Sequence, residues 1–224
     1  MKSLIPNLLT ASNLVFGMIA IISTFAGQFF QAALFIVIAM VADGMDGRVA
    51  RYFKVSSDFG KELDSLCDLV SFGVAPAMLA YAFSLKDFGV AGTAVAAAFA
   101  TCGALRLARF NVNTSTVKGY FMGLPIPAGG CVVATFVALG VRPSGWTFPV
   151  IVAIFAYLMI STIKYPDFKG HGERVRLFPA ILTLLLAAYI LFTVPKALLF
   201  VIFFSYSILG ILNTAFSLFD NKSV

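Results

Sequence analysis

The chain has 224 residues, of which 60% are hydrophobic and only 12% are charged, and its formal net charge is +6. Ordinary soluble domains carry roughly 25% charged residues, and a soluble fold cannot remove this much apolar surface from water. The mean hydropathy of +0.97 excludes intrinsic disorder. The 16 basic residues are dispersed through an apolar chain, so they form no nucleic-acid-binding face. The composition therefore predicts an integral membrane protein.

Uncharged stretches long enough to cross a bilayer predict the transmembrane helices, because one crossing needs about 20 apolar residues. Short turn-like connections separate these stretches, and no Pro-rich or Ser-rich linker divides the chain. We therefore predict one all-α domain over residues 1–224, a polytopic membrane bundle of about eight transmembrane helices. The predicted helices cover residues 7–26, 29–53, 60–84, 88–112, 125–141, 145–163, 176–193 and 196–219.

Basic residues are distributed unequally between the two ends of these helices. Only Lys86, Arg142 and Lys196 lie on one side. The other thirteen lie on the opposite side, which also carries the N-terminus: Lys2, Arg48, Arg51, Lys54, Lys61, Arg106, Arg109, Lys118, Lys164, Lys169, Arg174, Arg176 and Lys222. Cytoplasmic loops carry an excess of Lys and Arg. We therefore expect both termini to face the cytoplasm, with the chain in the cytoplasmic (inner) membrane.

Six of the ten acidic residues fall within one segment of 26 residues, at the predicted connection between the second and third helices. Asp43 and Asp46 share one face of the second helix, and Asp64 and Asp68 share one face of the third. An antiparallel turn near residue 57 sets Asp46 level with Asp68. It places all four aspartates roughly 6–15 Å inside the cytoplasmic helix ends. The spacing therefore predicts four convergent carboxylates, whereas Asp58 and Glu62 flank the pattern and are expected to be solvated.

Four ionised carboxylates at this depth repel one another and are costly to desolvate unless cations balance them. Oxygen ligands favour Mg²⁺, Mn²⁺ or Ca²⁺, and zinc is disfavoured because its usual His and Cys ligands do not cluster in this sequence. Two divalent ions would neutralise the cluster and form a clamp for phosphoryl transfer. Arg51 lies about two turns beyond Asp43 and could hold a phosphate. Gly47 and Gly60 would allow a ligand to approach the backbone closely.

The acidic segment resembles the signature of the CDP-alcohol phosphatidyltransferase family, and all eight positions that the signature fixes are matched. These are Asp43, Asp46, Gly47, Ala50, Arg51, Gly60, Asp64 and Asp68. Four further segments resemble the membrane-embedded phosphatidylserine synthases of that family. They are Pro6–Thr10 with Asn13, Leu63–Pro76, Ala104–Asn111 and Phe121–Pro127. The resemblance covers roughly residues 4–130, and the last three helices match only in general character.

The resemblance implies a role for each matched residue. Two ions, Mg²⁺ or Mn²⁺, would be bound by Asp43, Asp46, Asp64 and Asp68. Asp68 would also be the general base. Gly47, Ala50 and Gly60 would line the nucleotide site together with Asn7 and Thr10, and Arg51 would contact the phosphates as part of the catalytic set. Asn13, Arg106, Arg109 and Lys118 would bind the acceptor or a lipid phosphate, although membrane anchoring is an equally good account of Arg106 and Arg109.

The reaction implied is attack of the L-serine hydroxyl on the lipid-linked phosphorus of CDP-diacylglycerol, which yields phosphatidylserine and CMP. The family also suggests a homodimer. Related enzymes that use glycerol phosphate or inositol phosphate are the nearest alternatives. A cation or proton transporter is the alternative from another class, because intramembrane aspartates also line ion paths. Diacylglycerol and archaeol-type lipids are not distinguished by the sequence.

Overall fold

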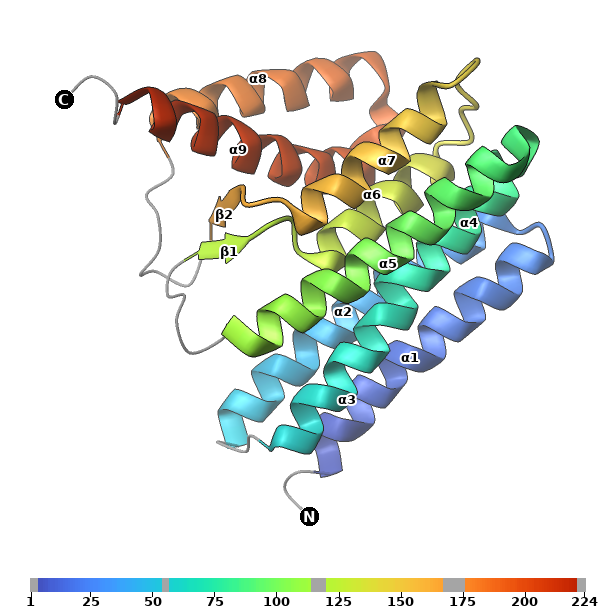
Figure 1. Cartoon of the computed structure of the whole chain (residues 1–224), viewed down its shortest axis with the longest axis vertical. Helices are drawn as coiled ribbons and strands as arrows, with labels where there is room; N and C mark the ends of the chain where they lie inside the picture. The colour runs from blue at the N-terminus through green and yellow to red at the C-terminus, as the bar shows by residue number, and fades with distance from the viewer. Residues whose placement is uncertain (1–3, 54–56, 114–119, 167–175, 221–224) are drawn as a thin grey trace.

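The computed structural model describes residues 4–53, 57–113, 120–166 and 176–220. Helices dominate these residues and lie side by side in a bundle (Figure 1). They are α1 (Leu4–Phe25), α2 (Phe29–Phe53), α3 (Asp58–Asp68), α4 (Ala75–Phe83), α5 (Gly89–Asn113), α6 (Ile126–Ala138), α7 (Thr147–Ile160), α8 (Leu177–Thr193) and α9 (Leu198–Asp220). A π-helical turn at Leu69–Val74 joins α3 to α4, and short 3₁₀ turns at Leu85–Phe88 and Pro195–Ala197 precede α5 and α9.

The predicted all-α membrane bundle is confirmed. Because α3 and α4 form one continuous segment, each predicted helix matches one observed segment. The second helix has the predicted bounds, and most other ends differ by a few residues. Within the described residues, five helical segments are long and apolar enough to cross a membrane. Helices α6, α7 and α8 have 13, 14 and 17 residues. They fall short of the roughly 20 residues that one crossing needs, so eight crossings remain a prediction.

Consecutive segments run in opposite directions. The turns that join α1 to α2, α4 to α5, α6 to α7 and α8 to α9 gather at the upper right in Figure 1. Both ends of the described chain, Leu4 and Asp220, lie at the opposite end, as do the last turn of α2 and the first turn of α3. All helix ends that carry the clustered basic and acidic residues therefore lie at one end of the bundle.

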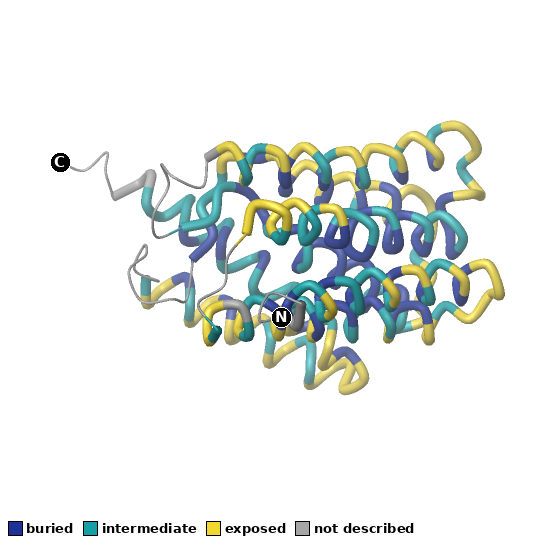
Figure 2. Tube along the Cα trace, turned by 90° about the horizontal axis from the view of Figure 1, so that it is seen from below, coloured by how far each residue is buried: buried dark blue, intermediate teal, exposed yellow. Residues whose placement is uncertain are grey.

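The core runs through the middle of the bundle, and the outward faces remain apolar and exposed (Figure 2). Helices α4 and α6 are buried along most of their length. Gly130 on α6 lies against the backbone of Phe72 in the π-helical turn before α4, where a Cβ atom would come within 2.5 Å of the carbonyl oxygen. By contrast, α8 exposes large side chains such as Leu184 and Phe192. Exposed apolar surface of this kind suits contact with lipid chains.

A two-stranded antiparallel sheet at one edge of the bundle was not predicted. It pairs β1 (Tyr120–Met122) with β2 (Lys164–Pro166), and Phe121 faces Tyr165 across the pair. Each strand has only three residues, and α6 and α7 separate them in sequence. A two-residue hairpin turn, which is the strongest local signal for such a pair, is therefore missing. Strand β2 is joined to α9 by the Lys164 N–H, which donates to Thr214 Oγ1 at 3.0 Å.

The π-helical turn follows directly after Asp68. In such a turn the backbone bonds span five residues rather than four, and here the Ala75 N–H donates to the Val70 carbonyl. The Ser71 hydroxyl donates to the Asn13 carbonyl at 3.0 Å, and Gly17 leaves room for this serine beside α1. The turn therefore fixes α1 against the helix that carries two of the predicted site aspartates.

Candidate active site

Three aspartates from two helices converge inside the bundle. Asp43 lies on α2, and Asp64 and Asp68 lie on α3. One carboxylate oxygen from each of the three lies within 4.8 Å of the others. Asp68 is only 8% exposed and Asp43 and Asp64 are partly buried. Mutual repulsion and lost hydration both disfavour three ionised carboxylates in this position, so the cluster has the electrostatic character of a cation site.

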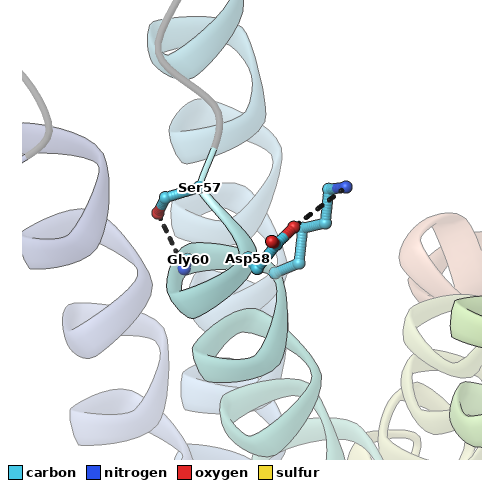
Figure 3. A network of polar contacts seen from close by, with 4 residues as sticks. Ser57, Asp58 and Gly60 are labelled. Atoms are coloured by element: carbon cyan, nitrogen blue, oxygen red, sulfur yellow. Dashed lines mark hydrogen bonds and ion pairs between the residues drawn. The ribbon is translucent and has the colours of Figure 1, made fainter.

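A serine cap sets the start of α3. Ser57 is its N-cap residue, and its hydroxyl accepts a hydrogen bond from the Gly60 N–H at 3.0 Å (Figure 3). A serine in this position satisfies one of the free N–H groups of the first turn. The helix therefore begins at Asp58, two residues before the predicted start. Asp43 rather than Asp46 joins Asp64 and Asp68 in the group of three, and the predicted position of Asp46 level with Asp68 stays a prediction.

Asp58 and Glu62 lie away from this cluster, as predicted. The Asp58 carboxylate is fully exposed and approaches Lys61 Nζ at 3.8 Å (Figure 3). Glu62 is also exposed. Exposed ion pairs of this kind contribute about 0–1 kcal/mol. These charges therefore belong to the solvated first turn of α3.

Helix α1 supplies neutral donors to the buried aspartates. The Thr10 hydroxyl donates to Asp46 Oδ2 at 2.6 Å, and Asn13 Nδ2 donates to Asp68 Oδ1 at 3.0 Å. Asn13 is completely buried and Thr10 is 5% exposed. Asn7 lies one turn earlier, and its Oδ1 is beside Gly60. The sequence singled out these three α1 residues through a family resemblance, but the specific pairing of Thr10 and Asn13 with carboxylates was not predicted.

The donor set fits a divalent oxygen-binding cation. Asp64 Oδ1 and Asn13 Oδ1 are buried without a hydrogen-bond partner among the described residues. The cluster contains three carboxylates and neither sulfur nor nitrogen ligands. This set suits Mg²⁺ or Mn²⁺. Asp46 lies one turn along α2 from Asp43 and outside this group of three, so its role as a fourth ligand stays a prediction.

The motif residues Gly47, Ala50 and Arg51 occupy the last turns of α2. Arg51 is exposed, and its Nη1 lies 3.6 Å from the position that a Cβ atom would take on Gly47. The guanidinium therefore folds back over Gly47, and Ala50 lies between the two in sequence. A Cβ atom on Gly60 would lie 3.2 Å from Ser57 Oγ and 3.4 Å from Asn7 Oδ1.

Arg106 and Arg109 on α5 differ sharply in their surroundings. Arg106 is 7% exposed, and its Nε has no hydrogen-bond partner in the described part of the chain. Its guanidinium lies over the Phe110 ring at 5.2 Å and interacts electrostatically with Asp68. The Arg109 guanidinium instead donates to backbone carbonyls, the shortest bond being 2.8 Å to Ile160 O. Lys118, the remaining predicted acceptor residue, lies outside the described residues.

Comparison with known proteins agrees with this geometry. The family model described as CDP-alcohol phosphatidyltransferase matches residues 3–217. The chain is 40% identical over 220 residues to a Helicobacter pylori protein named CDP-diacylglycerol–serine O-phosphatidyltransferase, covering 95% of this chain and 92% of the relative. A Bacillus subtilis protein of the same name is 41% identical over 176 residues, covering 76% of this chain and 94% of the relative. An archaetidylserine synthase from Methanothermobacter thermautotrophicus is 37% identical over 170 residues, or 75% of this chain and 72% of the relative. This chain belongs to the CDP-alcohol phosphatidyltransferase family.

Proposed function

We propose that the protein transfers the phosphatidyl group of CDP-diacylglycerol to the hydroxyl of L-serine and releases CMP. The observation that carries this proposal is the buried cluster of Asp43, Asp64 and Asp68, which lies in membrane-spanning segments beside the motif glycines. Relatives named for this reaction match most of the chain. A site at one end of a membrane bundle also suits the substrates, because serine comes from water while the acyl chains stay in lipid.

Asp43, Asp64 and Asp68, with Asp46, would hold Mg²⁺ or Mn²⁺, as one or two ions. Such ions would neutralise the pyrophosphate of the substrate and the charge that develops on CMP as it leaves. The residues that surround the cluster keep it in shape. Asn13 and Thr10 each donate one hydrogen bond to a carboxylate oxygen, which fixes its orientation without adding charge.

Asp68 is the proposed general base. It would accept the proton of the serine hydroxyl while the serine oxygen forms a bond to the lipid-linked phosphorus. The bond between that phosphorus and the CMP oxygen breaks in the same displacement, and the electron pair leaves with CMP. Asp68 suits this role because it is the most buried member of the cluster of three and Asn13 holds one of its oxygens. A carboxylate held in this way keeps its second oxygen available for the proton.

The nucleotide is proposed to bind over Gly47, Ala50 and Gly60, with Arg51 at the phosphates. The Arg51 guanidinium already lies over Gly47, and Asn7 lies beside Gly60. Thr10 would contribute through Asp46 rather than by direct contact, since its hydroxyl donates to that carboxylate.

Arg106 is the proposed contact for the serine carboxylate. A buried guanidinium with an unpaired Nε is costly unless an anion joins it. The serine hydroxyl must reach Asp68, and Arg106 interacts electrostatically with Asp68. Because serine is small, its carboxylate then falls in the region of Arg106. Asn13 would support this acceptor site through its bond to Asp68.

Both termini and the active site are proposed to face the cytoplasm, in the inner membrane. Thirteen of the sixteen basic residues belong to the end of the bundle that carries both termini of the predicted topology, and cytoplasmic loops are the ones enriched in such residues. A homodimer remains a prediction from family resemblance alone.

The acceptor is tested by CMP release from CDP-diacylglycerol, with purified protein and serine, glycerol phosphate or inositol phosphate in turn. We expect release with serine, loss of release after EDTA treatment and recovery with Mg²⁺ or Mn²⁺. Release with another acceptor alone would place the chain among the related enzymes. Cation flux in proteoliposomes without CMP release with any acceptor would favour the transporter.

The base is tested by comparing Asp68→Asn with Asp43→Asn. Asp68→Asn should lower turnover by about 10²–10⁴-fold, because an amide cannot accept the proton, while CDP-diacylglycerol binding largely persists. Asp43→Asn should weaken binding more, because it unbalances the ligand set. Turnover of Asp68→Asn within a few-fold of the parent would contradict the assignment, and equal loss of binding in both variants would make Asp68 chiefly a ligand.

The supporting hydrogen bond is tested with Asn13→Leu, which removes the donor to Asp68. Direct titration with Mn²⁺, followed by its paramagnetic resonance signal, should give an affinity about 10–100-fold weaker, as for other residues that orient metal ligands. Ser12→Ala is the matched control, because the Ser12 hydroxyl donates to the Leu9 carbonyl of its own helix. Equal Mn²⁺ affinities in the two variants would remove Asn13 from the metal site.

Orientation is tested in intact cells with single-cysteine variants in which the three native cysteines are replaced. We expect Lys86→Cys to react with a membrane-impermeant maleimide and Ser57→Cys to react only after the cells are opened. The reverse pattern would invert the proposed topology.

A further inference from the structure

Arg109 on α5 gathers four backbone carbonyls from two other elements. Its Nη1 donates to Ile160 O at 2.8 Å. Its Nη2 lies within hydrogen-bonding distance of Met122 O at 2.9 Å, Ser161 O at 3.0 Å and Met159 O at 3.3 Å. One guanidinium thereby joins α5 to the end of α7 and to β1.

This contact completes the C-terminus of α7, where the last four carbonyls of a helix lack intrahelical partners. Tyr157 O accepts from the Ser161 N–H, and Leu158 O accepts from the Leu124 N–H. The two carbonyls that remain are those that Arg109 binds. A cation also complements the negative end of the helix dipole, so Arg109 acts as a capping group supplied by a different helix.

Gly123 makes the close approach possible. Its φ of +78° favours glycine, and a Cβ atom there would collide with Met159 O and lie 2.7 Å from Arg109 Nη2. Its N–H donates to Ile163 O at 2.8 Å. The chain after β1 therefore passes directly against both the arginine and the end of α7.

A line of ring contacts leads from this joint to Arg106. Met122, which Arg109 holds, follows Phe121 on β1. The Phe121 ring lies 6.2 Å from the Phe110 ring, and Phe110 carries the Arg106 guanidinium at 5.2 Å. The position of β1 therefore affects the aromatic surface on which Arg106 rests.

We propose that Arg109 is a positioning residue for Arg106 and makes no contact with substrate itself. By fixing β1 and the end of α7 against α5, it holds the Phe121–Phe110 pair in place and with it the Arg106 guanidinium. This inference rests on the proposed function, because it requires that Arg106 binds an anionic substrate group. Arg109 then keeps the binding site for the anionic substrate group at a fixed distance from Asp68.

The experiment measures the KM for serine and for CDP-diacylglycerol separately, with the melting temperature of each variant. Arg106→Lys first identifies the substrate whose KM depends on Arg106. Arg109→Lys should raise the KM for the same substrate by about tenfold and leave the other within about twofold, because a lysine ammonium lacks the rigid planar fork with which the two guanidinium nitrogens together reach all four carbonyls. Phe121→Leu, which keeps the backbone joint, should raise the same KM to a smaller extent. The double variant Arg109→Lys with Phe121→Leu should raise this KM by less than the product of the two single effects, because the two residues belong to one network.

Arg176→Lys is the matched control, because Arg176 Nη1 also donates to a backbone carbonyl, that of Phe216 at 3.2 Å. It should leave both KM values unchanged. A lower melting temperature in Arg109→Lys with unchanged KM values would give Arg109 a purely structural role and overturn the inference. Unchanged KM values in Arg106→Lys would instead refute the proposed role of Arg106, and the inference would fall with it.

Discussion

Buried negative charge is the constraint on which the rest of this structure depends. Asp43, Asp64 and Asp68 bring carboxylate oxygens within 4.8 Å of one another in helices that are long and apolar enough to span a membrane. Hydrophobic burial alone cannot hold such a group together, since each charge loses hydration and repels the others. Neighbouring helices supply neutral donors on α1 and a buried arginine on α5.

Arg106 and Arg109 lie one turn apart on α5, yet the fold gives these identical side chains different contacts. Arg109 meets backbone carbonyls and closes the end of α7, whereas the Arg106 Nε has no partner in the described part of the chain. The first arrangement stabilises the fold at its own site because one guanidinium bonds four backbone carbonyls. The second leaves binding capacity in a buried place, and unsatisfied capacity of this kind is characteristic of functional sites rather than of cores.

Sequence patterns predicted the parts that depend on local chemistry. The second helix was predicted at both ends because an uncharged run fixes its start and the predicted connection its end, and the aspartate cluster followed from helical spacing. The start of α3 at Asp58 was missed by two residues because it depends on the Ser57 cap, and the three-residue strands were missed because α6 and α7 separate them in sequence. Arg106 and Arg109 share one pattern, so only tertiary contacts distinguish them. Eight crossings and the ligand role of Asp46 stay predictions.

The π-helical turn after Asp68 has a consequence for how this membrane segment can change in evolution. An α-helix advances 100° per residue, so one residue gained or lost would rotate everything beyond it by more than a quarter of a turn. The wide turn at Leu69–Val74 absorbs such a residue between the half that carries Asp64 and Asp68 and the half that packs in the core. The half that carries the two aspartates and the packing half therefore keep separate angular phases. A residue gained or lost between them can be accommodated in the wide turn without turning the aspartates away from Asp43, provided that the turn is kept.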